Sequence, residues 1–311
     1  MLSRLADHLF WMSRYLERAE NTVRMLDVAQ ALVMTNPELN RSTLFAPLAH
    51  TGLNDLFEER YDELNLVNLL EFFTMDEANP SSVYQCFKQA RESAHAARGK
   101  INMETWEGIN STWLEMQARK NRGLQGWNVN ELFDWVKTRC HIYRGTTGGT
   151  FVRTDAYQFT KLGSSLERAD NTARILLVRF SEDMDEELDL PGTEDYYALT
   201  ALLRSMSVFE SYQEIYRGEL APDKILELLI FRSDLPRSLR WCVQSIMSTF
   251  LKIEGDAGIS VKRRCAELNA RLNYGSVEDL REQGVVSYLE SFLDNIHDIG
   301  AGIRTEYLEA V

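Results

Sequence analysis

The chain has 311 residues, with 34 basic and 47 acidic side chains and a net charge of −13 at neutral pH. This balance argues against nucleic-acid binding as the main function, because there is no excess of lysine and arginine to neutralise phosphates. No apolar run reaches the roughly 18–20 residues that span a bilayer, and the first twenty residues lack the apolar centre of a signal peptide. We therefore expect a cytoplasmic protein that does not enter a membrane.

Apolar residues recur at helical spacing along the chain, which predicts an all-α fold of roughly ten to twelve helices. Two short apolar runs, LEFFTM and LELLIF, could pass for strands, but both lie inside longer stretches of helical periodicity. The glycine-rich stretch Gly145–Thr150 is the clearest predicted loop. The acidic stretch Ser181–Leu190 is typical of a solvated loop or a frayed helix end.

Several residues predict where helices begin. Asn79 before Pro80 indicates an N-cap followed by a proline in the first turn. Pro222 and Pro236 fit the same first-turn role, and Ser276 with Asp279 predicts a capping box.

Two segments of the chain occur twice. LERAENTVRML (Leu16–Leu26) and LERADNTARIL (Leu166–Leu176) are identical at eight of eleven positions, 150 residues apart. Leu70–Cys86 matches Leu226–Cys242 at an offset of 156, with Leu, Glu, Pro, Ser and Cys coinciding. Two matches at nearly the same offset predict an internal duplication rather than a solenoid.

The duplication predicts a multi-helix bundle with two pseudo-equivalent halves, residues 1–145 and 151–311, packed as one globular unit. We expect the two helices that carry the repeated phrase to be adjacent, with their polar sides facing each other. Four widely spaced cysteines without a C-x-x-C pair indicate small buried side chains in a reducing compartment, rather than a disulfide framework or a zinc site.

The repeated phrase places polar residues along one side of each helix. At about 100° per residue, apolar side chains gather on one side and a stripe of acids, amides and arginines on the other. This Glu/Arg stripe comprises Glu17, Glu20, Asn21 and Arg24 in the first copy and Glu167, Asp170, Asn171 and Arg174 in the second, with Arg18 and Arg168 at its edge. Apolar residues such as Phe10 and Leu177 flank the stripe along the helix, which predicts that it is covered by protein and that its charges are paired.

Three readings of the stripe stay open. It can be a structural network of ion pairs between the duplicated helices. It can be a binding site whose arginines, Arg18, Arg24, Arg168 and Arg174, hold a carboxylate or a phosphate. It can also be a dimetal carboxylate centre, but such sites take Glu-x-x-His from two neighbouring helices, and of the five histidines only His95, after Glu92, has this spacing, so we predict no bound metal and no cofactor.

Other catalytic patterns are weak. The sequence GTTGGT has no following Gly-Lys-Ser/Thr and is not a phosphate-binding P-loop. A single histidine such as His141 is more often a satisfied interior residue than a catalytic one, and the spacing picks out no Ser-His-Asp or Cys-His group.

The doubled phrase, with NPSSVYQC and LPRSLRWC downstream, resembles the bacterial alpha-E family over Met1 to about Leu308. The family's glutamate–arginine pair matches Glu17–Arg18 and Glu167–Arg168. Where many relatives have Gly-Arg before the phrase, this chain has Ser13-Arg14 and Gly163-Ser164, and the missing arginine at Ser164 breaks a symmetric four-arginine anion site.

The resemblance implies an all-helical protein found beside, or fused to, a circularly permuted ATP-grasp protein, often with a transglutaminase-like protein. It implies a cytoplasmic system that forms or processes amide bonds on a peptide-like molecule. We therefore expect a helical accessory partner whose Glu/Arg stripe binds or orients the substrate or the partner. The alternative is a stand-alone enzyme in which Glu17 or Glu167 is a general acid–base beside an arginine-held anionic substrate.

Overall fold

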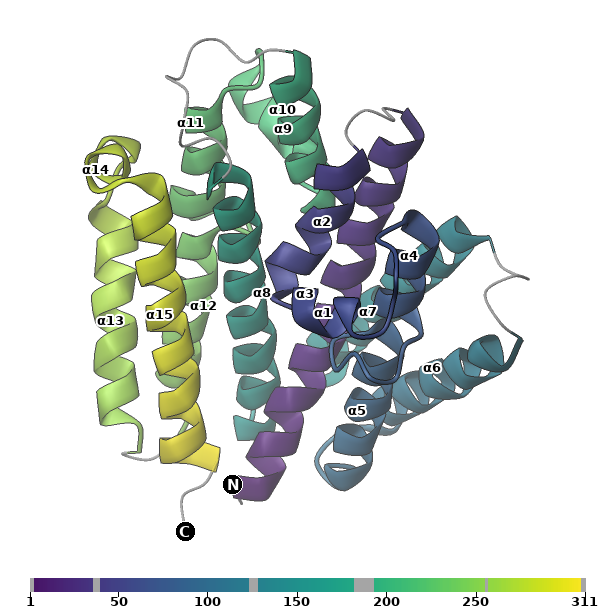
Figure 1. Cartoon of the computed structure of the whole chain (residues 1–311). Coiled ribbons are helices and arrows are strands. Elements are labelled where there is room, and N and C mark those ends of the chain that lie inside the picture. Colours follow the sequence, from purple (N-terminus) through teal and green to yellow (C-terminus); the bar gives the residue numbers. More distant parts are fainter. Residues whose placement is uncertain (1–2, 36–39, 123–127, 182–192, 255–256, 309–311) are drawn as a thin grey trace. The chain divides into compact units, whose positions relative to one another are not determined.

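The computed structural model describes residues 3–35, 40–122, 128–181, 193–254 and 257–308 (Figure 1). Within these ranges the chain forms fifteen α-helices, two π-helical turns and no β-strand, so the predicted all-α fold is confirmed. The number of helices exceeds the predicted ten to twelve because several, such as α3 (Asn54–Glu58), are only one or two turns long. The acidic stretch expected after Ser181 lies outside the described residues.

The chain divides into two compact units. The first is Met1–Ser164 with Lys252–Glu254 and Leu308–Val311, and the second is Ser165–Leu251 with Gly255–Tyr307. The division falls inside α8 (Asp155–Ser181), whose first turns belong to the first unit. The predicted halves, 1–145 and 151–311, stay a prediction, as does the internal duplication.

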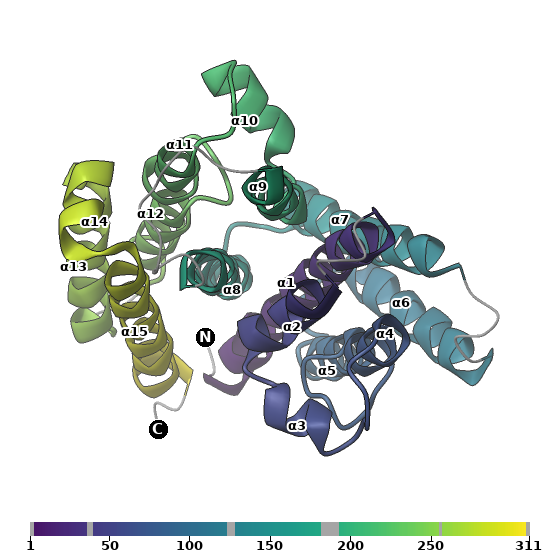
Figure 2. The same cartoon turned by 45° about the horizontal axis from the view of Figure 1, so that its top comes forward.

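The first unit is built around the 33-residue helix α1 (Ser3–Thr35). Helices α2 (Asn40–Thr51), α4 (Leu66–Thr74), α5 (Val83–Ala96) and α7 (Val129–Thr150) pack against α1, and α6 (Met103–Arg122) packs against α5 and α7 (Figure 2). The apolar side of the repeated phrase supplies the core: Leu16 is 3% exposed, and Ala19, Val23 and Leu26 are fully buried. The predicted apolar side of this helix is confirmed.

The second unit continues α8 and adds a series of mostly shorter helices. In chain order they are α9 (Thr193–Ser205), α10 (Phe209–Tyr216), α11 (Pro222–Leu226), the π-helical turn η3 (Glu227–Phe231), α12 (Leu239–Phe250), α13 (Ile259–Tyr274), α14 (Val277–Gln283), α15 (Val285–Ile303) and the π-helical turn η4 (Arg304–Leu308). Helix α13 packs against both α12 and α15. The runs LEFFTM and LELLIF lie in α4 and in α11 with η3, so both are helical as predicted.

The predicted helix starts are partly right. Pro222 lies in the first turn of α11, and Ser276 and Asp279 form the expected capping box of α14. The start at Asn79 is wrong: α5 begins after Ser82, whose hydroxyl accepts from the Gln85 backbone N–H at 3.2 Å. Asn79 is instead fully buried, and its side-chain amide donates to the Phe72 carbonyl at 3.0 Å. This hydrogen bond holds the turn before α5 against α4.

The same correction applies in the second unit. Ser238, and not a residue before Pro236, caps α12 by accepting from the Trp241 backbone N–H at 3.0 Å. A serine two residues after the proline therefore begins the helix in both places, because its hydroxyl accepts from a first-turn backbone N–H, which a proline side chain cannot do.

The predicted loop at Gly145–Thr150 is wrong, because these residues form the last turns of α7. Threonine hydroxyls donate to carbonyls one turn earlier, Thr147 to Tyr143 at 2.7 Å and Thr150 to Thr146 at 2.6 Å. The packing of Tyr143 and Thr147 into the core holds the segment helical and overrides the low helix propensity of glycine.

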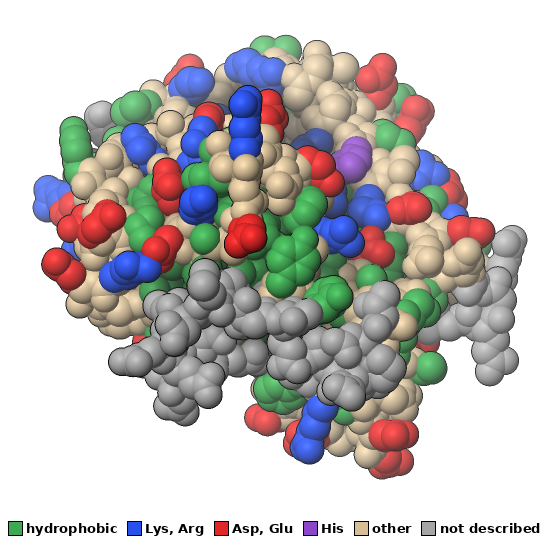
Figure 3. All heavy atoms as spheres, turned by 90° about the horizontal axis from the view of Figure 1, so that it is seen from above, with side chains coloured by type: hydrophobic (Ala, Val, Ile, Leu, Met, Phe, Trp, Pro, Cys, Tyr) green, Lys and Arg blue, Asp and Glu red, His purple; other side chains and the backbone are tan. Residues whose placement is uncertain are grey.

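The four cysteines, Cys86, Cys140, Cys242 and Cys265, are free thiols in the interior, as predicted. In the part of the chain that the structure describes, no helix is long and apolar enough to cross a membrane. On the face shown in Figure 3, basic side chains lie among acidic and apolar ones rather than in a block.

Candidate functional site

The first copy of the Glu/Arg stripe is buried in the first unit. Glu17 is 4% exposed, Glu20 is 1% exposed and Asn21 is 7% exposed. The apolar residues on the opposite side of the same helix are buried as well. Helix α1 is thus covered on both sides, because α7 packs over the polar one. The prediction that protein covers the stripe is confirmed here.

Glu20 is at the centre of a cluster of charged side chains. Its carboxylate accepts from Arg24 Nε at 2.9 Å, one turn along α1, and from Arg144 on α7. His141, also on α7, places Nε2 3.6 Å from the same carboxylate and 3.3 Å from Arg24 Nη2. The pairing predicted for the charges of the stripe is confirmed for Glu20 with Arg24, and two guanidinium groups from two helices stabilise one buried carboxylate.

Glu17 lies one turn before Glu20, with Arg144 Nη1 3.7 Å from its carboxylate. The two acids adjoin a small cavity, on the scale of about one water molecule, which is lined by Ser13, Leu16, Glu17, Glu20, Cys140, Tyr143, Arg144 and Ser164. Ser164 therefore lies beside the same acids. Arg144, which comes from a different helix, supplies a cation there.

Small side chains bring α8 close to α1 next to this cavity. A Cβ atom on Gly163 would lie 2.2 Å from the Phe10 carbonyl oxygen and 2.3 Å from Ser13 Oγ. Ser13 itself turns inward and donates to the Phe10 carbonyl at 2.9 Å. The approach requires glycine at position 163, since no larger residue fits without moving backbone.

Two further polar groups of α7 border the cavity. Cys140 donates its thiol hydrogen to the Leu16 carbonyl at 3.3 Å. Burial, with Glu20 nearby, raises the pKa of Cys140 well above its usual value, and burial likewise raises the pKa of Tyr143. Both groups therefore stay protonated at neutral pH and act as donors rather than as nucleophiles.

The second copy of the stripe is buried in the second unit. Glu167 is 5% exposed, Arg168 9% and Asn171 8%. Asp170 accepts from Arg174 Nε at 2.8 Å, and His297 Nε2 on α15 lies 3.0 Å from the carboxylate and 3.1 Å from Arg174 Nη2. Burial alone would raise the pKa of Asp170, but the contacts with His297 and Arg174 outweigh it and lower this pKa.

The arginines expected at the edge of the stripe differ in position. Arg168 is buried, donates to the Pro236 carbonyl at 3.4 Å and lies 6.0 Å from the centre of the Trp241 ring. It therefore reaches the turn that precedes α12. Arg18 is half-buried, with its guanidinium 6.0 Å from the centre of the Tyr15 ring.

Three residues of these clusters are not predicted from the sequence: His141, Arg144 and His297. A signal for the histidines was present, since the offset of 156 between the downstream repeats aligns His141 with His297. Each of them touches the acid and the arginine of its own stripe. Arg144 had no such signal, because the same offset aligns it with Gly300.

Among the described residues, no three or more His, Cys, Asp or Glu side chains are grouped so as to hold a metal ion. Arginines occupy the positions around Glu20 and Asp170 where a cation would lie. What the site provides chemically is a set of buried, neutralised carboxylates with protonated donors beside them.

Comparison with known proteins identifies one family. Residues 1–308 match the Alpha-E family, described as a predicted alpha-helical domain with a conserved ER motif. Uncharacterized proteins of Mycobacterium bovis and of two Mycobacterium tuberculosis strains are 22% identical over 320 residues, which cover 94% of this chain and 35% of each relative. No solved structure matches the chain significantly.

This chain thus spans about a third of the length of the curated relatives it matches. The repeated phrase contains the sequence ER at Glu17–Arg18 and Glu167–Arg168, the two positions predicted for the family's motif. Both glutamates are buried in the structure, one in each unit. The chain belongs to the Alpha-E family.

Proposed function

We propose that this protein is a helical accessory component of a cytoplasmic, ATP-grasp-linked system that forms or modifies amide bonds on a peptide-like molecule. Its partner is a circularly permuted ATP-grasp protein, with a transglutaminase-like protein as a further component. In this proposal the Glu/Arg stripes keep the helices in position, and surfaces next to them bind or orient the substrate or the partner.

The burial of the Glu20 carboxylate, which is paired with two arginines, is the observation that supports the proposal most directly. A general acid–base must meet its substrate, so it needs an open cleft at the carboxylate. Glu20 is instead 1% exposed and held by Arg24 and Arg144. The cavity beside it is on the scale of about one water molecule, which favours a structural and positioning role over stand-alone catalysis.

Two further considerations support the partner. The resemblance to the alpha-E family implies a circularly permuted ATP-grasp protein as a neighbour or a fusion. The curated relatives are also about three times as long as the matched segment, so in them this kind of domain is joined to further sequence.

The test compares ATP turnover and amide product formation for this protein alone, for the cognate ATP-grasp protein alone and for the mixture. We expect no turnover by this protein alone, a stable complex in the mixture, and turnover that depends on the nucleotide site of the ATP-grasp protein. ATP hydrolysis by this protein alone, or the absence of a complex, would contradict the proposal.

Arginine variants locate the contact. The pair Arg18→Ala and Arg168→Ala is expected to reduce product formation in the mixture, with Arg263→Ala on the exposed side of α13 as the control. Because Arg168 is buried, each variant is first compared with wild type by thermal melting. Unchanged product formation by a folded double variant removes both arginines from the proposed contact.

A further inference from the structure

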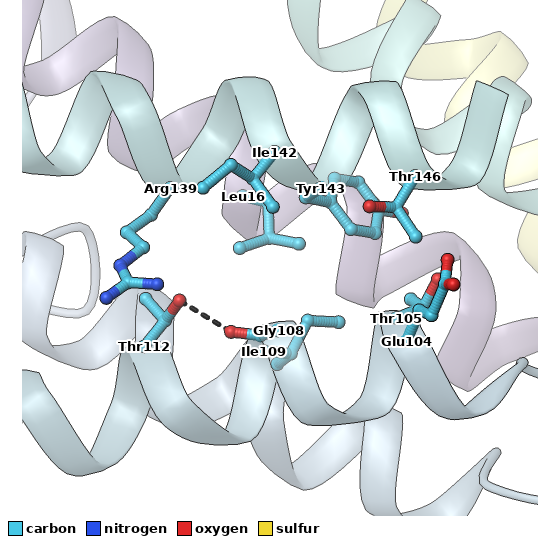
Figure 4. A pocket seen from close by; sticks show the side chains of 10 residues that line it. All are labelled: Leu16, Glu104, Thr105, Gly108, Ile109, Thr112, Arg139, Ile142, Tyr143 and Thr146. Atoms are coloured by element: carbon cyan, nitrogen blue, oxygen red, sulfur yellow. Dashed lines mark hydrogen bonds between the residues drawn. The ribbon is translucent and has the colours of Figure 1, made fainter. Parts of the chain in front are cut away.

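Several basic side chains of the first unit are paired with acids. Arg139 borders a space between α6 and α7 that has room for about one water molecule (Figure 4), and its guanidinium is ion-paired with Glu115. Lys137 on α7 is ion-paired with Asp27 and Asp134. Such pairs are expected in a chain where 47 acidic side chains accompany 34 basic ones. A group of cations without an acid beside it therefore needs a separate explanation.

Three basic residues lie together where α8 begins. Arg153 precedes the helix, Lys161 lies in its second turn, and Lys252 belongs to the short segment 252–254. This segment contacts the first turn of α8, because the Glu254 backbone N–H donates to Asp155 Oδ1 at 3.4 Å. All of these residues belong to the first unit. We refer to Arg153, Lys161 and Lys252 as the cation cluster.

Contacts with its neighbours hold Arg153 in place. Its guanidinium lies 4.0 Å from the centre of the Tyr157 ring and donates to the Gly148 carbonyl at 2.6 Å. Its backbone carbonyl accepts from the side-chain amide of the buried Gln158 at 3.3 Å. Lys161 follows Tyr157 by four residues, so the two side chains lie on the same side of α8. The start of α8 therefore presents two cations on one side.

The cation cluster has no acid paired with it. In the part of the chain that the structure describes, none of its three members is ion-paired with a carboxylate. Burial lowers the pKa of Lys161, and the positive charges of Lys252 and Arg153 lower it further. Holding like charges together lowers stability, so such a cluster is a candidate site for a ligand of the opposite charge.

The cluster is accessible and suits a phosphate group. Lys161 is half-buried, whereas Arg153 and Lys252 are exposed, so an anion in solution can reach them. A phosphate monoester carries a charge of about −1.5 to −2 at neutral pH and has three terminal oxygens that accept hydrogen bonds. Arginine can donate to two of these oxygens at once, and lysine acts as a point charge. A carboxylate, with a single negative charge and two oxygens, would balance only one of the three cations.

We propose that the cation cluster binds the phosphate group of a phosphate monoester, with Arg153, Lys161 and Lys252 contacting its terminal oxygens. The group can belong to a soluble molecule or to a lipid headgroup, and the experiment distinguishes these two sources. The site is separate from the Glu/Arg stripe. The inference goes beyond the proposed function and does not depend on the ATP-grasp complex.

The experiment titrates the full chain, with lysine side chains isotope-labelled next to the amine, against glycerol 3-phosphate at constant ionic strength. The NMR signals of Lys161 and Lys252 should shift and saturate. The pKa of Lys161 should be higher in the bound state, because the anion stabilises the charged amine. Lys88 on α5, which lies near the acid Glu77 rather than near cations, is the internal control and should not shift.

Variants test the role of each charge. Lys161→Gln and Arg153→Gln should each weaken binding about 10-fold or more, the factor for one lost hydrogen bond to a charged group. Lys161→Arg keeps the charge and should retain most of the affinity, and Lys88→Gln should leave it unchanged. Because Lys161→Gln removes one of three like charges, its melting temperature in chloride should equal or exceed that of wild type. This result would separate the loss of binding from a loss of folding.

Vesicles of phosphatidylcholine, with and without phosphatidic acid, identify the source of the phosphate. Retention on phosphatidic-acid vesicles that Lys161→Gln abolishes, without binding of glycerol 3-phosphate, assigns the group to a lipid headgroup. Binding of glycerol 3-phosphate without retention assigns it to a soluble molecule, and either result supports the site. The proposal is overturned if neither probe binds, if both glutamine variants keep wild-type affinity, or if acetate binds more tightly than glycerol 3-phosphate.

Discussion

Helices α7 and α15 cover the polar stripes of their own units with different surfaces. Each brings a histidine, His141 or His297, to the acid and arginine of the stripe. At the offset of 156 that aligns these histidines, the neighbouring residues change from polar to apolar: Cys140, Tyr143 and Arg144 correspond to Ile296, Ile299 and Gly300. In the second unit a Cβ on Gly300 would lie only 3.2 Å from Leu166 Cδ2.

The comparison separates what both units keep from what only one has. Both have an acid, an arginine one turn later and a histidine from a distant helix, an arrangement that is suited to fixing a pair of helices. Among the described residues, the first unit adds to this arrangement a second arginine, a protonated thiol, a tyrosine hydroxyl and a small cavity, where the aligned residues of the second unit are Ile296, Ile299 and Gly300. We therefore expect ligand chemistry in the first unit and mainly packing in the second.

The largest expected effect is the loss of the arginines around Glu20. Arg24→Ala combined with Arg144→Ala should lower the free energy of unfolding by roughly 3–5 kcal/mol, because the carboxylate left behind is buried and uncompensated. Arg174→Ala in the second unit should cost only about 1 kcal/mol, since the Asp170 side chain is 17% exposed and keeps His297. Chemical denaturation followed by circular dichroism measures both.

A matched control tests the reason for this difference. Adding Glu20→Gln to the double variant removes the buried charge and should restore most of the lost stability. If the first-unit and second-unit variants lose equal stability, the two clusters are energetically alike and the contrast between the units is wrong.

The next effect concerns close packing at glycine. Gly163→Ala should lower the free energy of unfolding by about 1–3 kcal/mol, because its Cβ would meet the Phe10 backbone carbonyl at 2.2 Å. Gly300→Ala should lose less, since it meets a movable leucine methyl. Gly148→Ala, which meets nothing within 4 Å, should gain about 0.5–1 kcal/mol. Melting curves of the three variants that follow another order would contradict the packing at α1.

A smaller effect is the acid sensitivity of the second cluster. The contacts with His297 and Arg174 hold the pKa of Asp170 below its usual value, despite burial. Its contribution to stability is therefore complete above about pH 4, the unfolded-state value, and is lost as the pH falls toward the folded-state pKa. The difference between wild type and Asp170→Asn, about 1–2 kcal/mol at neutral pH, should shrink steadily below pH 4. Asp298→Asn, an exposed acid paired with Arg264, should show little such change.

The smallest expected effect is on the rate at which buried thiols are labelled in the native protein. This rate compares how readily the two units open and does not require a change in stability. Burial raises the pKa of Cys140 and raises that of Cys265 to about 12. In variants that keep one of these cysteines each, labelling of the native protein at pH 8 should be slower than in the unfolded chain by on the order of a thousand-fold. Rapid native labelling of Cys140 alone would show that the first unit opens more readily than its buried cluster suggests.

Much of the fold follows from local patterns. Helical periodicity predicts the all-α class. The spacing of about 100° per residue in the repeated phrase also predicts that Leu16 and Leu26 are buried on one side and that Glu17 and Glu20 are covered on the other. The Glu20–Arg24 and Asp170–Arg174 pairs were predictable because residues four apart are neighbours on a helix.

Features that depend on distant contacts were not predictable in this way. Arg144 reaches Glu20 across 124 positions of sequence, and periodicity carries no information on such a pair. Local preference predicts Asn79 as a helix cap, because it cannot show that the Phe72 carbonyl accepts from the Asn79 amide. Gly145–Thr150 has the composition of a loop, but packing against the core keeps it helical.

The glycine-rich end of α7 has a consequence for local opening of this helix. Gly145, Gly148 and Gly149 contribute little side-chain contact, and glycine is a poor helix former, so we expect these last turns to have the lowest local stability in the helix. Arg144, which donates to the buried Glu20 carboxylate, directly precedes Gly145. The ion pair therefore marks the point at which opening of the helix end stops, and backbone amides of residues 145–150 will exchange with solvent faster than those around Cys140.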